Sequence, residues 1–201
     1  AVVSAIFASD DCALATRKLF VKTRELFGKK RNIIMDMDGT LADSMPFWKK
    51  SAREYAILRG ADIPDNFDEI TGVMDLNDYA EYVKNVLGID TNLEQITEAA
   101  VEIMNKHYEK DIPAKDGMTE LVTREYKAGS RLVVFTASDR RSVEILLSHL
   151  GIRECFYDIY TVYDVGLKKS DKNSYLKVAE LAGMKDTSQV WVYEDILRGV
   201  K

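Results

Sequence analysis

Two carboxylates two positions apart, Asp36 and Asp38, are the residues of this chain whose types and spacing most directly suggest chemistry. They follow an apolar run at 32–35 that predicts a β-strand, and Gly39 predicts a turn directly after them. Open α/β sheets place their chemistry at the carboxyl ends of strands. Two carboxylates this close repel each other unless a cation shares them, so the segment predicts a Mg²⁺ site. A solvated turn is the alternative for such a pair taken alone, and the strand before it disfavours that interpretation.

Polar residues also follow two further apolar runs that predict strands. Thr136-Ala137-Ser138 comes after the first of these runs, and Glu194 and Asp195 come after the second. Carboxylates at the ends of two strands supply the hard oxygen ligands that Mg²⁺ prefers. Each feature alone has a plainer interpretation: a threonine after a strand is more often a turn or a helix cap, and an acidic pair at a helix start is more often a partner for the helix dipole.

Taken in order, these segments resemble the four motifs of the haloacid dehalogenase superfamily of phosphatases and phosphomutases, over residues 32–201. The segments are Asp36-x-Asp38-Gly39-Thr40-Leu41-x-Asp43-Ser44, Thr136-Ala137-Ser138, Lys169 with Tyr175 six residues later, and Glu194-Asp195 followed by Gly199. Lys168 also offers the lysine of the third motif, but the spacing of Lys169 to Tyr175 matches the family pattern. Two prolines of that pattern are replaced here by Ser170 and Lys172. A solvated basic loop is the plainer interpretation of this segment.

The resemblance implies a role for each of these residues. Asp36 is expected to attack phosphorus and form an aspartyl-phosphate, and Asp38 to act as general acid and base. Thr136 is expected to hydrogen-bond the transferring phosphoryl group, and Lys169 to neutralise its oxygens. The expected Mg²⁺ ligands are Asp36, Asp38 and Asp195, with Glu194 acting directly or through water. The expected substrate-binding residues are Thr40, Ala137, Ser138 and Trp48. For Trp48, packing in the core is an equally open alternative.

The elements around these motifs predict an α/β fold with an inserted helical segment. The expected helices are 47–59, 76–87, 93–108, 118–128, 141–150 and 174–182, and the expected strands are 32–35, 131–136, 159–162 and 189–193. After Pro113 strands alternate with helices, which implies right-handed βαβ units and a parallel sheet. With the resemblance, this predicts a Rossmannoid parallel-sheet core at 1–44 and 115–201. The helical cap subdomain is expected at 45–114, where it would close over the site and exclude bulk water.

Composition excludes several classes of protein. The 201 residues carry a formal charge of −5, which disfavours non-specific nucleic-acid binding, because that affinity comes mainly from cations on the protein. No apolar run approaches the roughly 20 residues that cross a bilayer. Two cysteines, Cys12 and Cys155, form no metal-binding or disulfide pattern, which favours a reducing compartment, and we expect a cytoplasmic protein. Its expected partner is a small phosphorylated metabolite, and its expected state a monomer or weak dimer.

Two alternatives to a phosphatase remain open at this point: a sugar phosphomutase built on the same core, and a non-catalytic binding protein with a decayed site. The complete set of motif residues argues against decay, and dehalogenation would leave Asp38 without a role. The β-phosphoglucomutases that the chain resembles carry a histidine on the first cap helix that gates the acid/base residue, and alignment on Asp43-Ser44 puts Trp48 there. An indole can neither titrate near pH 7 nor accept a hydrogen bond, so release of phosphate should exceed isomerisation.

The first 28 residues lie before the motifs. The β-branched run Ala1–Phe7 predicts a strand, and a helical stripe over Leu14–Phe27 ends at Gly28. The resembling family continues past its fourth motif with a helix and a strand, so we expect Ala1–Phe7 to occupy the sheet position next to 189–193, as in a circularly permuted chain. An N-terminal extension on a truncated chain is the alternative.

Overall fold

The computed structural model describes residues 30–72, 74 and 76–195. The expected strand Ala1–Phe7 and helix Leu14–Phe27 lie outside the described residues, as do Cys12 and Gly199. The predictions made for these residues therefore remain untested.

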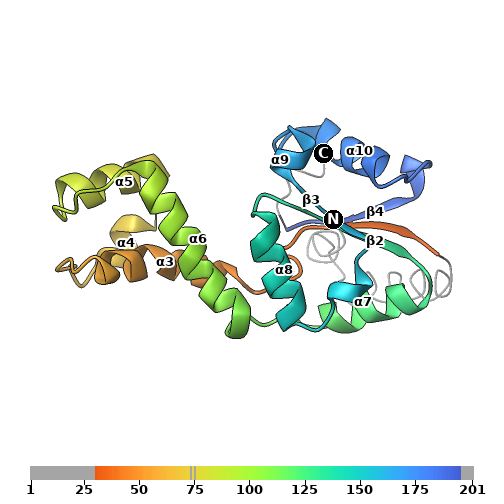
Figure 1. Ribbon diagram of the computed structural model, residues 1–201, viewed down its shortest axis with the longest axis horizontal. Helices are drawn as coiled ribbons and strands as arrows, with labels where there is room; N and C mark the ends of the chain where they lie inside the picture. The colour runs from red at the N-terminus through yellow and green to blue at the C-terminus, as the bar shows by residue number, and fades with distance from the viewer. Residues whose placement is uncertain (1–29, 73, 75, 196–201) are drawn as a thin grey trace, which may run out of the picture.

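A four-stranded parallel sheet forms the centre of the fold (Figure 1). Its strands are β1 (Asn32–Met35), β2 (Arg131–Thr136), β3 (Asp158–Thr161) and β4 (Val190–Tyr193), in the order β3-β2-β1-β4. β-branched and other apolar residues dominate each strand, as strands covered on both faces require. The predicted α/β fold with a parallel sheet is confirmed.

The register of the sheet brings the strand ends together. Met35 lies opposite Val134 of β2 and Tyr193 of β4, and the backbone N–H of Asp36 donates to the carbonyl of Tyr193 at 3.0 Å. The chain therefore leaves β1 and β4 side by side at one edge of the sheet, where an open α/β sheet carries its ligands.

Helices cover both faces of the sheet. The helices are α3 (Met45–Leu58), α4 (Phe67–Thr71), α5 (Leu76–Asn85), α6 (Leu93–Lys110), α7 (Met118–Lys127), α8 (Arg140–His149), α9 (Val162–Val165) and α10 (Lys172–Leu181), with single 3-10 turns at Arg153–Cys155 and Thr187–Gln189. Ile33 and Met35 pack with residues of α7 and α8, whereas Ile34 packs with α9 and α10 on the opposite face. The two pairs of helices lie on either side of the sheet in Figure 1.

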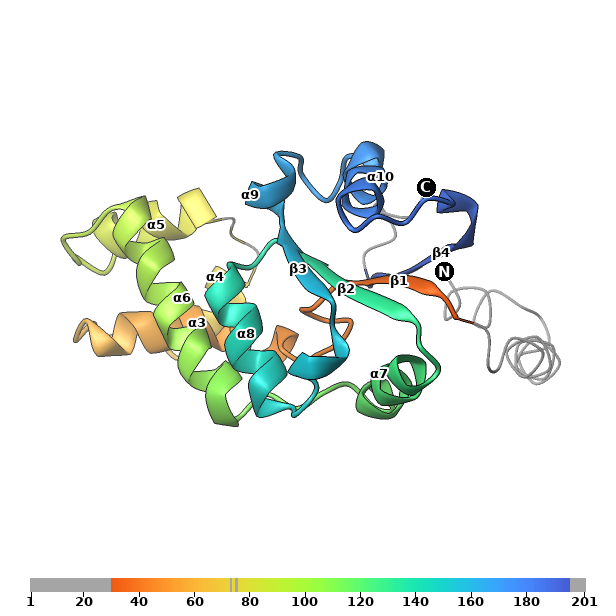
Figure 2. The ribbon, with the colours of Figure 1, turned by 45° about the vertical axis from the view of Figure 1, so that its right-hand side comes forward.

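Helices α3 to α6, here called the helical insertion, follow β1 and extend beside the sheet (Figure 1). They have a core of their own, in which Tyr55, Phe67, Val83 and Ile103 are buried. Figure 2 shows α6 lying along α8 of the sheet layer. A buried hydrogen bond of 2.7 Å from Ser142 Oγ of α8 to Asn105 Oδ1 of α6 joins the two.

Three short helical segments differ from the sequence expectations. Val162, expected to end a strand, begins α9 because Thr161 and Asp164 form a capping box in which each side chain accepts from the other's backbone N–H. Gln189, expected to begin a strand, lies in a 3-10 turn capped by the side chain of Asp186. The five-residue helix α4 was not expected, because it is shorter than the window over which helical spacing is recognisable.

Candidate active site

Asp36 occupies the carboxyl end of β1 and is almost fully buried, with 4% of its surface exposed. Thr40 Oγ1 donates to its Oδ2 at 3.1 Å, and Lys169 Nζ forms an ion pair with its Oδ1. Lys169 comes from the loop between α9 and α10, 133 residues further along the chain. The fold therefore brings the first and third sequence motifs into direct contact.

Lys169 also links Asp36 to the end of β4. Its Nζ lies 2.7 Å from Glu194 Oε2, and the hydroxyl of Tyr175 donates to the same oxygen. Burial, and then the neighbouring Glu194, raise the pKa of Tyr175 far above its usual range, so this hydroxyl stays protonated and donates. Glu194 is thereby held between a cation and a permanent hydrogen-bond donor.

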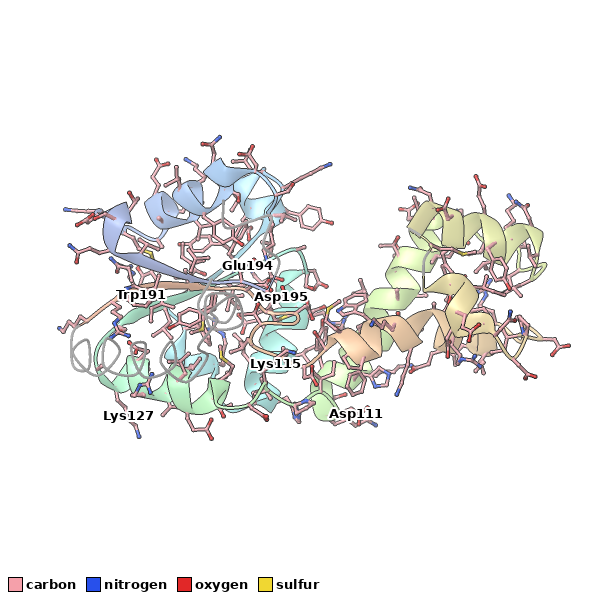
Figure 3. All side chains as sticks on the ribbon, turned by 180° about the vertical axis from the view of Figure 1, so that it is seen from behind. Asp111, Lys115, Lys127, Trp191, Glu194 and Asp195 are labelled. Carbon is pink, nitrogen blue, oxygen red and sulfur yellow. The ribbon has the colours of Figure 1, made fainter. Side chains whose placement is uncertain are left out.

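Three carboxylates converge at this point. Asp36, Glu194 and Asp195 each offer an oxygen, and the three oxygens lie within 4.8 Å of one another. Figure 3 shows Glu194 and Asp195 at the end of β4, on the side of the sheet that faces the helical insertion. Hard oxygen donors grouped this closely fit a divalent cation such as Mg²⁺, which is bound through one or two carboxylates and keeps several waters.

Gly39 makes this convergence possible. Its φ of +82° lies in the left-handed region, and a Cβ at this position would stand 2.3 Å from Asp195 Oδ2. Only glycine lets the turn after Asp38 pass so close to the carboxylate at the end of β4. Gly39 thus leaves room for the Asp195 carboxylate in the cluster.

The electrostatics of the cluster are unfavourable in the absence of a cation. Burial raises the pKa of Asp36 to about 6; the positive charge of Lys169 opposes this rise, and the negative charge of Glu194 adds to it. Burial and Glu194 likewise raise the pKa of Asp195. Asp36 is buried and Asp195 is exposed, so the cluster runs from the interior to the surface. One lysine among three carboxylates leaves net negative charge there, and a bound cation would relieve it.

Asp38 faces a different set of partners. Its Oδ2 accepts from Ser138 Oγ at 2.7 Å, and its Oδ1 accepts from Trp48 Nε1 at 3.2 Å and from the hydroxyl of Tyr108 at 2.5 Å. These donors come from the loop after β2, from α3 and from α6. The Asp38 carboxylate is absent from the acidic cluster found among the described residues, so its predicted role as a Mg²⁺ ligand has no support from its side chain.

The second motif begins at the end of β2 and reaches Asp38 through Ser138. Thr136 ends β2 and is buried, and its Oγ1 accepts from the backbone N–H of Ser138 at 3.1 Å. Ala137 is exposed between them. Ser138 therefore connects Thr136 to Asp38, and Thr136 stands on β2, which pairs with β1 just before Asp36.

Two tyrosines were not among the predicted site residues. The spacing of Tyr175 to Lys169 was noted, but only as a marker of the motif. Tyr108 carried no local signal, because its contact with Asp38 depends on how α6 packs against α3 and against the sheet layer.

Comparison with known families settles the chain's relationship. Residues 33–201 match the family model described as haloacid dehalogenase-like hydrolase. The chain belongs to this family. The haloacid dehalogenase-like assignment agrees with the four motifs, three of which lie at the ends of strands and one of which, Lys169, lies in the loop before α10.

The curated relatives of this haloacid dehalogenase-like protein include Protein SUPPRESSOR OF QUENCHING 1, chloroplastic, from Arabidopsis thaliana. The two are 28% identical over 183 residues, which cover 87% of this chain and 17% of the Arabidopsis protein. The chain thus corresponds to less than one fifth of that relative. No helix in the described part of the chain is both long enough and apolar enough to cross a membrane.

Solved structures share the fold. A candidate β-phosphoglucomutase from Thermotoga maritima has a TM-score of 0.71 at 22% identity, over 85% of this chain and 78% of that one. CbbY from Rhodobacter sphaeroides, solved in complex with phosphate, has a TM-score of 0.67 at 22% identity, over 86% and 80%. YfnB from Bacillus subtilis, a candidate haloacid dehalogenase-type hydrolase solved with bound magnesium, has a TM-score of 0.64 at 14% identity, over 82% and 79%.

Proposed function

We propose that this chain is a Mg²⁺-dependent phosphomonoester hydrolase that acts on a small phosphorylated metabolite through an aspartyl-phosphate at Asp36. The observation that carries the proposal is the ion pair of buried Asp36 with Lys169, together with its closeness to the two acidic residues that follow β4. A nucleophilic carboxylate, a cation for the phosphoryl oxygens and ligands for a metal are the parts that phosphoryl transfer requires.

Asp36 and Asp195 would hold Mg²⁺, with Glu194 binding it directly or through water. Three convergent carboxylate oxygens and the close approach of Gly39 support this fit. When bound, Mg²⁺ supplies positive charge that offsets the charge of the phosphoryl oxygens and the repulsion between the carboxylates.

The chain's own residues would then divide the reaction into two steps. Asp36 attacks phosphorus as the bond from phosphorus to the substrate's ester oxygen breaks, and Asp38 gives its proton to the leaving alcohol. In the second step Asp38 takes a proton from water, which attacks the same phosphorus, so that inorganic phosphate leaves and Asp36 is regenerated. Lys169 offsets charge on the phosphoryl oxygens, and Thr136 donates a hydrogen bond to them.

The helical insertion, with the segment to residue 114, would act as the cap of this site. The contacts of Trp48 and Tyr108 with Asp38 support that role, because they bring two of its helices to the reacting groups. A cap closed over the substrate would exclude bulk water during the first step.

Hydrolysis is preferred to phosphomutase activity because of Trp48. Its Nε1–H donates to Asp38, and an indole can neither accept a hydrogen bond nor titrate near pH 7. Trp48 therefore cannot act as the gate that would keep Asp38 from activating water. With glucose 1-phosphate as the substrate, we expect free phosphate to form faster than glucose 6-phosphate. Dominant isomerisation would replace the hydrolase proposal by the mutase.

The first experiment measures phosphate release from 4-nitrophenyl phosphate with and without Mg²⁺. We expect Mg²⁺-dependent turnover that is lost in Asp36→Asn, which keeps the side-chain volume and removes the nucleophile. The matched control is Asp158→Asn, the same substitution at the opposite edge of the sheet, where Asp158 pairs with Arg140 at 3.3 Å. Turnover that survives in purified Asp36→Asn would refute the mechanism, and an inactive wild type across aryl, sugar and nucleotide phosphates would refute the function.

A further inference from the structure

The helical insertion contacts Asp38, the acid/base candidate, through one buried and one half-buried side chain. Trp48 from α3 and Tyr108 from α6 each donate to Asp38 Oδ1, at 3.2 and 2.5 Å. Tyr108 is 1% exposed, and its ring belongs to the core formed between the insertion and the sheet layer. The Asp38 carboxylate, which lies just after β1, is therefore held by donors from the helical insertion.

The direction of these hydrogen bonds is determined by the chemistry of the donors. Trp48 Nε1 can only donate, and it also lies 3.2 Å from the hydroxyl oxygen of Tyr108. The Tyr108 oxygen thus accepts from Trp48, which directs its own proton to Asp38. Burial, and then the neighbouring charge of Asp38, raise the pKa of Tyr108 far above its usual range, so the hydroxyl keeps this proton.

One face of α6 joins this arrangement to the sheet layer. Asn105 lies three residues before Tyr108, so the two side chains project from the same side of the helix. The Asn105 side chain lies 2.7 Å from Ser142 Oγ of α8 within the buried interface, and Ser142 Oγ also contacts Asp139 at 2.5 Å. The seating of α6 on α8 therefore determines where the Tyr108 hydroxyl stands.

We propose that Tyr108 is a positioning residue for Asp38, and that with Trp48 it makes the placement of the acid/base carboxylate depend on the seating of the helical insertion on the sheet layer. The catalytic half of this proposal rests on the proposed function, whereas the structural half does not. Tyr108 acts through Asp38 and has no role in the chemistry itself.

The structural half is tested by the indole N–H resonances of the protein in two-dimensional NMR. The chain has two tryptophans, so two such resonances are expected. Tyr108→Phe and Asp38→Asn should each shift the Trp48 resonance and leave that of Trp191 in place. The control is Tyr79→Phe, which removes a buried hydroxyl bonded to the Ala52 carbonyl at 2.7 Å within the insertion. A Trp48 resonance that is unchanged in both Tyr108→Phe and Asp38→Asn would overturn the proposal whether or not the protein is a phosphatase.

The catalytic half is tested by comparing two leaving groups. Alkyl alcohols need a proton from the general acid as they leave, whereas 4-nitrophenolate leaves readily without one. Because the second step is the same for both substrates, the leaving groups are compared through kcat/KM, which reports the first step. Tyr108→Phe should lower kcat/KM for an alkyl phosphate about tenfold or more, the size expected for one hydrogen bond to a charged group, and lower kcat/KM for 4-nitrophenyl phosphate much less. Tyr79→Phe should leave the ratio of the two rates unchanged.

A merely structural role for Tyr108 would lower kcat/KM equally for the two substrates, and that result would overturn the catalytic half. Should the wild type hydrolyse neither substrate, the proposed function fails while the indole resonances still decide the structural half. Trp48→Phe provides a second variant, because it removes the other donor and should change the ratio of rates in the same direction.

Discussion

Replacement of Asp36 by asparagine should stabilise the metal-free protein while abolishing its activity. Burial raises the pKa of Asp36 from 3.8 to about 6, although Lys169 opposes the rise. At 4% exposure the carboxylate is not screened by solvent. A difference of about two pK units corresponds to about 3 kcal/mol, by which the ionised carboxylate destabilises the folded state relative to the protonated one.

The pH dependence follows from the direction of this shift. Below about pH 3.8 the carboxyl is protonated in both the folded and unfolded states and the destabilisation is absent. As the pH rises from 3.8 to about 6, the unfolded state loses its proton first, so the free energy of unfolding falls. Above pH 6 both states are ionised, and the full difference of about 3 kcal/mol is present. Asparagine has nearly the same shape and carries no charge at any pH.

The assay is urea unfolding of wild type, Asp36→Asn and Asp158→Asn in excess EDTA, followed by circular dichroism at pH 8 and at pH 4. At pH 8 we expect Asp36→Asn to exceed the wild type by up to about 3 kcal/mol, or on the order of 6–12 °C in Tm for a chain of this length. At pH 4 the gain should nearly vanish, and Asp158→Asn should show no gain at either pH. An Asp36→Asn variant less stable than wild type at pH 8 would mean that the attraction of Lys169 outweighs burial, and the reasoning would be wrong.

Two further predictions concern the insertion and the turn. Burial lowers the pKa of His107, but its hydrogen bonds to Asp111 and Glu54 outweigh burial and raise the pKa overall. Protonated His107 therefore stabilises the fold below about pH 6.5, and this contribution is lost as the pH rises through the raised pKa. The loss of unfolding free energy in His107→Gln should therefore be larger at pH 6 than at pH 9, and an equal loss at both would contradict the linkage. Gly39→Ala should weaken Mg²⁺ binding, measured by calorimetry, because the new Cβ would stand 2.3 Å from an oxygen of Asp195 and the positive φ would be strained; unchanged affinity would show that this carboxylate is not a ligand.

Much of the fold follows from local patterns in the sequence. The runs that form β1 and β2 are apolar and end abruptly in polar residues. The bounds of both strands could therefore be predicted from the residues of the strands alone. Because parallel strands end at one edge of a sheet, the proximity of Asp36 to Glu194 could also be anticipated, and the three-carboxylate cluster bears this out.

The surroundings of Asp38 could not be predicted in the same way. The two-residue spacing of Asp38 from Asp36 would place both side chains on one face of a continuous strand. The chain instead turns just after Asp38, where Gly39 has a positive φ. Asp38 then takes its partners from α3 and α6, whose approach depends on packing between elements distant in the sequence. Trp48 was proposed near the substrate from the resemblance, but the hydroxyl of Tyr108 has no sequence signal of its own.

The nucleophilic role of Asp36 is tested most directly by mass spectrometry of protein quenched in acid during turnover. Wild type and Asp158→Asn should each carry one phosphoryl group on the peptide that contains Asp36, and fragmentation should assign it to that carboxylate. Asp36→Asn should carry none. Steady turnover by the wild type with no phosphorylated peptide under quenching that preserves acyl phosphates, or with the phosphoryl group on another residue, would contradict the proposed mechanism.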